Sequence, residues 1–218
     1  MIYLASRSPR RLALLEQIGI TDVRLLLDED EARAEALEAV RPKESPTQYV
    51  ERVARAKGEA AWARLMALRG TAGQAGTTDA WPLAPLLAAD TTVAVGGKIL
   101  GKPEDAGDAA RILGLLSGRS HRVLSSVVVI GPSGKLRQCT QVSRVRFRRL
   151  TDDDIAGYIA SGEPLGKAGA YGIQGLAACF VRRIEGSYSG IMGLPLFETA
   201  QLLGKVGVPP VRVDGSRA

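Results

Sequence analysis

Two hydroxyls and three guanidiniums lie close together at residues 6–11, which read Ser-Arg-Ser-Pro-Arg-Arg. The Ser-Pro pair is typical of a helix start, so Arg10 and Arg11 fall in the first helical turn. Free backbone N–H groups and the helix dipole already attract anions there, so two further cations indicate an anion that binds from outside. Ser6 and Ser8 add hydroxyl donors, and a phosphate chain would satisfy the whole cluster. A solvated basic turn is the alternative interpretation, and the spacing is not that of a Walker loop.

A lysine lies on the apolar face of the helix that is predicted to begin at Ser45-Pro46. Val50, Val53 and Lys57 follow a three-then-four spacing, which places them on one side of that helix. We therefore expect the ammonium to point toward the protein or into a cleft. The alternative is that the stem of the lysine covers apolar surface while its charge reaches solvent.

A carboxylate and a second lysine flank a predicted hairpin. Asp90 follows an apolar run and is predicted to end a strand, and Lys102 lies beyond the hairpin in Leu-Gly-Lys-Pro. This arrangement suits a metal-phosphate site, because Mg²⁺ prefers a few carboxylates together with waters and phosphate oxygens. Asp90 with one of Asp28, Asp30 or Glu31 would suffice. The acidic run that holds these three residues is otherwise typical of a solvated face.

A glycine-rich segment near the C-terminus contains a glutamine between two glycines. Gln174 lies between Gly172 and Gly175, and glycines allow the backbone to approach a ligand closely. The amide offers both a donor and an acceptor, which suits the edge of a nucleobase. A structural loop glutamine is the alternative.

Composition excludes several other chemistries. The chain has 218 residues, 45% of them hydrophobic, and a formal net charge of +6, which together predict a folded protein with an anionic partner. His121, Cys139 and Cys179 are the only histidine and cysteines, too few for a histidine-rich or four-cysteine zinc site or a disulfide framework. His121 is predicted to be a loop or strand-edge residue, and no nucleophile elbow accompanies it. The two cysteines are expected to be small buried hydrophobes in a reducing compartment, which predicts a cytosolic protein. The lack of a signal peptide and of a long apolar run predicts that no segment spans a membrane.

The elements that must position these residues alternate along the chain. Strands are predicted at 2–5, 23–27, 125–131 and 141–147, with a further strand that ends at Asp90 before a Gly96-Gly97 hairpin. Helices are predicted at 9–19, from 46 onward, at 104–116 and after Thr151, which with Asp154 resembles a capping box. Residues 69–85 are predicted to be an irregular surface loop. Interspersed strands and helices predict an α/β fold.

Five stretches of the sequence, taken together and in this order, are specific enough to indicate a protein family: ASRSPRR, ERVARAKGEAA, AADTTVAVGGKILGKP, LSGRSHRV and GEPLGKAGAYGIQG…IEGSYSGIMGLPL. They closely resemble the motifs of the Maf family, the septum-formation-inhibitor-like proteins, over nearly the whole chain. The resemblance implies a mixed twisted sheet with flanking helices and two lobes around a central cleft, similar to inosine triphosphate pyrophosphatases. It also implies one domain at residues 1–208, and we expect a C-terminal tail at 209–218.

The Maf family consists of nucleoside triphosphate pyrophosphatases, which cleave between the α- and β-phosphates and use a divalent cation such as Mg²⁺, Mn²⁺ or Co²⁺. The matching motifs imply that Asp90 binds the metal or activates water, and both roles stay open. Glu31 is the implied second acidic ligand. The resemblance implies that the triphosphate is held by Ser6, Arg10, Arg11, Lys57 and Lys102.

Substrate choice within the family is also implied by residues of this chain. The branch that acts on dTTP and UTP is similar in having Thr after the motif aspartate and a Tyr-Gly-Ile-Gln-Gly segment. Arg11, Thr91 and Gln174 are therefore the implied specificity positions. The branch that acts on 7-methyl-GTP carries Gln after that aspartate, which disfavours it. Gly58, where alanine is common in the family, is a departure.

Three hypotheses follow from the residues and the resemblance. The leading one is a cytosolic dTTP/UTP pyrophosphatase. The second is a 7-methyl-GTP or broad house-cleaning specificity on the same scaffold, and the third is a nucleic-acid-binding septation regulator without catalysis. The resemblance favours a nucleoside triphosphate over a nucleic acid as the partner, and it makes a homodimer plausible.

Overall fold

The structure is a computed structural model that describes residues 1–28, 30–74 and 80–210. In this part of the chain, seven strands form one sheet in the order β2-β1-β3-β5-β6-β7, with β4 paired to β3. β1 runs parallel to β2 and β3, and the other pairs are antiparallel. The strands are β1 (Ile2–Leu4), β2 (Val23–Leu25), β3 (Leu86–Val95), β4 (Lys98–Leu100), β5 (Ser120–Ile130), β6 (Leu136–Phe147) and β7 (Val181–Glu185). The predicted mixed α/β fold is confirmed.

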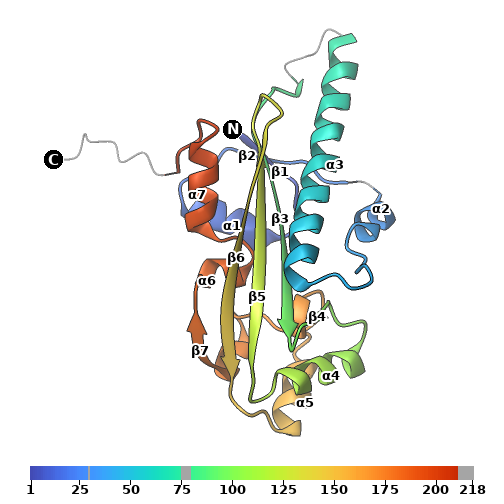
Figure 1. Ribbon diagram of the computed structural model, residues 1–218, viewed down its shortest axis with the longest axis vertical. Coiled ribbons are helices and arrows are strands. Elements are labelled where there is room, and N and C mark those ends of the chain that lie inside the picture. Colours follow the sequence, from blue (N-terminus) through green and yellow to red (C-terminus); the bar gives the residue numbers. More distant parts are fainter. Residues whose placement is uncertain (29, 75–79, 211–218) are drawn as a thin grey trace, which may run out of the picture.

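Helices cover both faces of the sheet (Figure 1). α3 lies along β3 and β5 on one face, α1 and α7 lie on the other face with α6 near them, and α4 packs against α5 near the start of β5. The α-helices are α1 (Pro9–Gln17), α2 (Glu31–Ala36), α3 (Pro46–Gln74), α4 (Ala106–Leu116), α5 (Asp152–Ala160), α6 (Tyr188–Met192) and α7 (Leu196–Gly204). Two 3₁₀ turns, η2 (Ala168–Ala170) and η3 (Leu176–Phe180), precede β7.

The side chains of β3 alternate between the two faces of the sheet. Leu86 and Ala88 pack in the cluster beneath α3, whereas Leu87 and Ala89 pack in the cluster beneath α1 and α7. Because strand side chains alternate with a period of two, the next two residues of β3 must also face opposite sides. The middle of β3 can therefore present functional groups to both helical layers.

The strand that carries Asp90 is longer than the sequence predicts. We expected it to end at Asp90, but β3 runs from Leu86 to Val95 and places the buried Asp90 in its middle. Thr91 and Thr92 continue the strand because both are β-branched and pair with β5. The carboxylate therefore lies within the sheet rather than at its edge.

The predicted boundaries of the irregular loop also need correction. α3 continues through Gln74, so the expected loop start at residue 69 is wrong, and residues 75–79 lie outside the described part of the chain. Arg69 is a good helix former, and Thr71 Oγ1 donates to the Ala67 carbonyl one turn earlier at 3.1 Å, so the helix continues although glycine is a poor helix former. Of the predicted tail, residues 211–218 also lie outside the described part.

Several local signals are confirmed. Pro9 begins α1, and Thr151 and Asp154 form a reciprocal capping box at the start of α5. Gly96 and Gly97 have positive φ values of 54° and 81°, as a tight hairpin turn requires. The glycine at position 58 has a packing reason, because a Cβ there would lie 2.9 Å from Val128 Cγ1 of β5.

Candidate active site

A cavity of about 900 Å³ lies where the first turn of α1, the middle of α3 and the middle of β3 meet the glycine-rich segment. It collects residues from separate stretches of the chain that the sequence singled out. The predicted site residues that line it are Ser6, Arg10, Arg11, Lys57, Asp90, Thr91, Lys102 and Gln174. Basic side chains outnumber acidic ones in its lining, so the cavity attracts anions.

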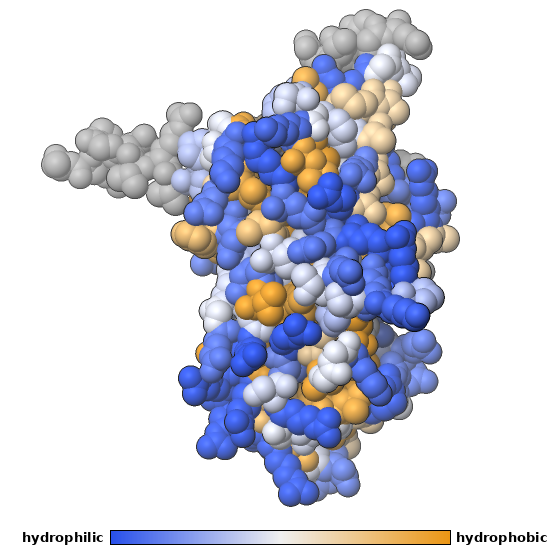
Figure 2. Space-filling view, in the orientation of Figure 1, coloured by the Kyte–Doolittle hydropathy of each residue, from blue (hydrophilic) through white to orange (hydrophobic). Residues whose placement is uncertain are grey.

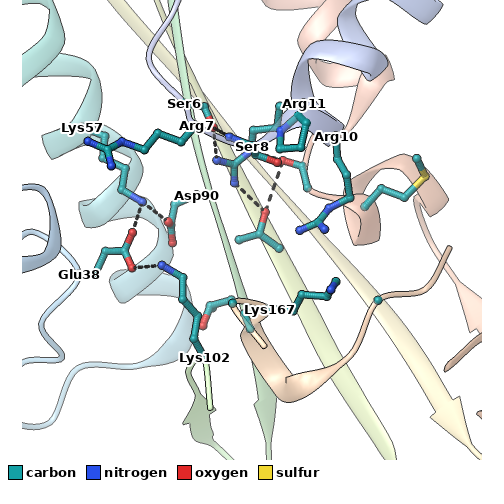
Figure 3. Close-up of a pocket in the computed structure, with 18 of the residues that line it drawn as sticks. Ser6, Arg7, Ser8, Arg10, Arg11, Glu38, Lys57, Asp90, Lys102 and Lys167 are labelled. Atoms are coloured by element: carbon teal, nitrogen blue, oxygen red, sulfur yellow. Dashed lines mark hydrogen bonds and ion pairs between the residues drawn. The ribbon is translucent and has the colours of Figure 1, made fainter. Parts of the chain in front are cut away.

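Four charged side chains are joined by ion pairs at the centre of this cavity, in the order Asp90, Lys57, Glu38 and Lys102 (Figure 3). The Lys57 ammonium lies 2.7 Å from both Asp90 Oδ1 and Glu38 Oε1. The second oxygen of Glu38 accepts a hydrogen bond from Lys102 at 3.0 Å. Lys57 is therefore directed inward, as its helical spacing predicts, and two carboxylates converge on one cation.

Glu38 is a site residue that the sequence analysis missed. It follows α2, and its place is fixed by two side chains from α3 that bind three successive carbonyl groups of its loop. Arg52 donates to the carbonyls of Leu37 and Ala39, and Tyr49 donates to the carbonyl of Glu38 itself. Burial would raise the pKa of Glu38, but Lys57 and Lys102 together hold it below its ordinary value, so the carboxylate is charged. No local motif around Glu38 predicts this placement.

The other acidic candidates have different surroundings. Asp28 lines the cavity but forms an ion pair of 2.5 Å with Arg64. Asp30 accepts a hydrogen bond from the backbone N–H of Arg33, and so caps the start of α2. Glu31 begins α2, and its side chain lies outside the described part of the structure.

Arg11 is held by protein atoms from three segments. Its guanidinium donates to the Gly193 carbonyl at 2.9 Å, to Ser6 Oγ at 3.0 Å and to Thr91 Oγ1 at 3.3 Å. Burial lowers its pKa, and the nearby charge of Asp90 acts in the opposite direction. Arg11 therefore fixes the turn to β3 and α6, and only part of its hydrogen-bonding capacity is left for a ligand.

Arg10 differs from its neighbour. Its side chain is exposed at the mouth of the cavity, and Figure 3 draws it without contacts to the other labelled groups. Its position in the first turn of α1 is the one that the sequence predicts for an anion-binding cation. Of the two arginines, Arg10 is the freer to bind an incoming phosphate.

The segment that carries Gln174 is held from both sides. The hydroxyl of Tyr171 forms a hydrogen bond of 2.9 Å with His121 Nε2, and Tyr158 Oη accepts from the backbone N–H of Gly172 at 3.1 Å. Glu163 accepts from Tyr158 Oη at 2.8 Å and from the backbone N–H of Leu176 at 2.9 Å. The ends of the segment are thus fixed, and the exposed Gln174 lies between them at the cavity.

The closeness of Glu163 to this segment gives a prediction for Gly175. A Cβ at Gly175 would overlap both carboxylate oxygens of Glu163, so Gly175→Ala must displace that carboxylate. We expect KM for the nucleotide to rise about tenfold with little change in kcat, because roughly one hydrogen bond that positions Gln174 is lost. Steady-state kinetics measure this effect. Gly157→Ala on exposed α5, where a Cβ meets nothing within 4 Å, is the control and should leave KM unchanged.

His121 was predicted to be a loop or strand-edge residue. This prediction is wrong, because the side chain is buried. It lies in β5, an interior strand, with its ring packed edge-on against Phe147 and Tyr171. Burial lowers its pKa to about 4, so the imidazole is neutral near pH 7. Its sequence surroundings, a polar turn, conceal this because the burial comes from distant elements.

The lowered pKa of His121 predicts acid sensitivity. Between pH 6.5 and 4 the unfolded state binds a proton that the folded state does not, so the free energy of unfolding falls as the pH falls through that window. Within this window His121 lowers the free energy of unfolding by about 1.4 kcal/mol for each pH unit of acidification. Urea unfolding of the protein and of His121→Phe at pH 7, 6 and 5 measures it. The variant should have the shallower pH dependence, and equal slopes would contradict the prediction.

The family model and the curated relatives agree on one family. The family model described as Maf-like protein matches residues 1–206. A Ralstonia nicotianae protein named dTTP/UTP pyrophosphatase is 58% identical over 207 residues, covering 95% of this chain and 94% of its own. A Cupriavidus metallidurans protein of the same name is 57% identical over 208 residues, covering 95% of this chain and 98% of its own. Among solved structures, a HAM1 protein from Coxiella burnetii matches with a TM-score of 0.45 at 16% identity, covering 94% of this chain and 98% of that one.

Two negative findings concern the described residues. None of their helices combines the length and the apolar character that are needed to cross a lipid bilayer. In the same part of the chain, no three His, Cys, Asp or Glu side chains gather as a ready metal-binding group.

Proposed function

The chain belongs to the Maf-like protein family, and from this premise we propose that it hydrolyses dTTP and UTP to the nucleoside monophosphate and pyrophosphate. The observation that carries the proposal is the identity of over 50% to relatives named dTTP/UTP pyrophosphatase, across nearly their whole length. The cavity supports it independently. Cations from α1, α3 and the segment after β4 face one space that is suited to a triphosphate.

A divalent cation fits the centre of this cavity. Asp90 and Glu38 approach the same ammonium within 2.7 Å, so two carboxylates already converge on one positive charge. Mg²⁺ needs only one or two carboxylates when phosphate oxygens and waters complete its shell. We therefore propose Asp90 and Glu38, in preference to Glu31, as the residues that hold the cation. When bound, it would neutralise charge on the phosphates and the leaving pyrophosphate.

The protein groups supply positioning and electrostatic stabilisation. Lys57, Lys102 and Arg10 would bind phosphate oxygens, and their charges favour the transition state over the substrate as negative charge builds on the leaving group. Asp90, whose Oδ1 is fixed by Lys57, would orient the attacking water and accept its proton. A bound triphosphate would take over the lysine contacts that Glu38 makes in the free protein.

We propose Arg11, Thr91 and Gln174 as the specificity residues. Thr91 Oγ1 lies 2.8 Å from Ser125 Oγ and also accepts from Arg11, so its position is fixed on the α1 side of β3. The Gln174 amide has both a donor and an acceptor, and would form hydrogen bonds with the edge of a pyrimidine. Because free nucleotides are the proposed substrates, we further propose a cytosolic enzyme.

A nucleotide panel tests the proposed function. The purified protein is incubated with dTTP, UTP, the other canonical triphosphates and 7-methyl-GTP, each with Mg²⁺, Mn²⁺ or Co²⁺ or with excess chelator. We expect pyrophosphate release from dTTP and UTP, and its loss with the chelator. Cleavage of 7-methyl-GTP in preference to both would assign the chain to the other specificity.

A further inference from the structure

A second hollow lies at the far end of the sheet, where β5 begins and β6 ends. It has a volume of about 410 Å³ and is lined by an arginine cluster: Arg119, Arg146, Arg148, Arg149 and Arg182. Asp90 pairs with Ser126 of β5, whereas Arg146 pairs with Ser120. Roughly 20 Å of strand therefore separates the two cavities. We call this second cavity the arginine pocket.

The charges of the arginine pocket are mostly uncompensated. Arg148 forms a two-bond ion pair with Asp154, with both distances 2.7 Å. The other four arginines of the pocket are exposed and have no ion pair within the described residues. Four guanidiniums without a carboxylate partner therefore line one small pocket. Their mutual repulsion would be smaller if they were spread over the surface.

The pairing of β6 with β7 determines where two of these arginines lie. On β6, Arg146 alternates with the buried Val145 and Phe147, so it faces outward. Arg146 pairs with Arg183 of β7, but the next pair is Phe147 with Val181, so Arg182 is an extra residue at a bulge. Arg183, which lies directly opposite Arg146, is compensated by Glu185, whereas Arg146 and Arg182 have no carboxylate partner among the described residues.

The lining also indicates what kind of anion fits. Its other members are glycines, a serine and Phe147, which is only 1% exposed, so no aromatic face is available to stack on a base. Glu185 lies opposite Arg144 and pairs with Arg183 at 3.0 Å, so a carboxylate interrupts the basic surface along β7. Figure 2 shows mainly hydrophilic side chains, with hydrophobic ones between them, at the lower end of the molecule. The cluster is a compact hollow, which is a poor match for an extended nucleic acid strand.

We propose that the arginine pocket binds a compact oligophosphate, such as pyrophosphate or tripolyphosphate, separately from the nucleotide cavity. The planar guanidinium matches phosphate oxygens in a two-bond geometry, and several such groups can surround a short chain of phosphoryl groups. The proposal does not depend on the proposed function. If the proposed reaction occurs, its own pyrophosphate product belongs to this ligand class.

Calorimetric titration of the full chain with tripolyphosphate tests this proposal. The variant combines Arg119→Gln, Arg146→Gln and Arg182→Gln, all exposed positions. A charge-matched control combines Arg55→Gln, Lys98→Gln and Lys135→Gln, which are exposed and line neither cavity. Each protein is titrated alone and again with a non-hydrolysable dTTP analogue, α,β-methylene-dTTP, in excess. Pyrophosphate release from dTTP is measured in parallel.

The protein and the control should bind tripolyphosphate in the presence of the analogue. The arginine variant should bind at least about a hundredfold more weakly, since each charged hydrogen bond lost costs roughly tenfold or more. Its kcat and KM for dTTP should match those of the control. Equal affinity in variant and control would overturn the proposal, as would tighter binding of a DNA oligonucleotide than of tripolyphosphate through the same arginines. Loss of dTTP hydrolysis in every protein, with the arginine effect kept, would count against the proposed function alone.

Discussion

Replacing Asp90 with asparagine is expected to reduce kcat for dTTP by about 10³-fold, within the range that a positioned acid or base contributes. Asparagine keeps the shape of the side chain but cannot accept a proton or supply a full negative charge to a cation. The residue is buried in the middle of β3 and hydrogen-bonded to Lys57, so the amide can occupy the same place. Initial rates of pyrophosphate release, with calorimetric titration of a non-hydrolysable dTTP analogue, measure the effect.

Asp153→Asn is the matched control for this substitution. Asp153 lies exposed on α5 and does not line the cavity, so the same chemical change there should leave kcat within twofold. We expect Asp90→Asn to retain most of its nucleotide affinity, because the cations that hold the phosphates stay in place. Turnover near that of the control would refute the role of Asp90.

Replacing Lys57 with methionine is expected to have the second largest effect. The ammonium would stabilise the developing charge on the phosphates, and loss of one such group costs about 10²-fold to 10³-fold in kcat. In the free protein the substitution also leaves Asp90 and Glu38 facing each other without the cation that they share. The variant should therefore unfold at a lower temperature than the natural protein in the absence of metal.

A divalent cation should reverse part of that loss of stability. If the two carboxylates form a cation site, Mg²⁺ or Mn²⁺ binds the folded state and should raise the unfolding temperature of Lys57→Met more than that of the natural protein. Thermal unfolding with and without metal measures this difference. Lys98→Met, on the exposed hairpin, is the control. An equal metal response in all three proteins would contradict the shared site.

The extent to which the sequence predicts the site depends on how local each signal is. The Ser-Pro pair before α1 and the spacing that carries Lys57 are encoded within one turn or one helix, and both predicted the positions that the structure has. Glu38 could not be found in this way, because Arg52 and Tyr49 of α3 determine its place through the backbone of its loop. Its importance depends on contacts between elements and on no residue pattern.

Asp90 and Arg11 illustrate two further limits. A charged residue between an apolar run and two threonines is a natural strand end by sequence, but pairing with β5 carries β3 through it. Arg11 was predicted to face an anion, and its hydrogen bond to Gly193, 182 residues away, is a tertiary contact that helical periodicity cannot indicate. The fold class was predictable because strand and helix patterns are local, whereas the exact partners were not.

Identifying which phosphoanhydride bond of dTTP is cleaved tests the central claim most directly. The claim is that cations from distant segments hold three linked phosphoryl groups, with a carboxylate-held metal, so that water attacks next to the nucleoside. Chromatography of the products formed by the purified protein with dTTP and Mg²⁺ should give dTMP and pyrophosphate in equal amounts, and Asp90→Asn should form the same two products about 10³-fold more slowly. Formation of dTDP and inorganic phosphate, or equal product from both proteins, would contradict it.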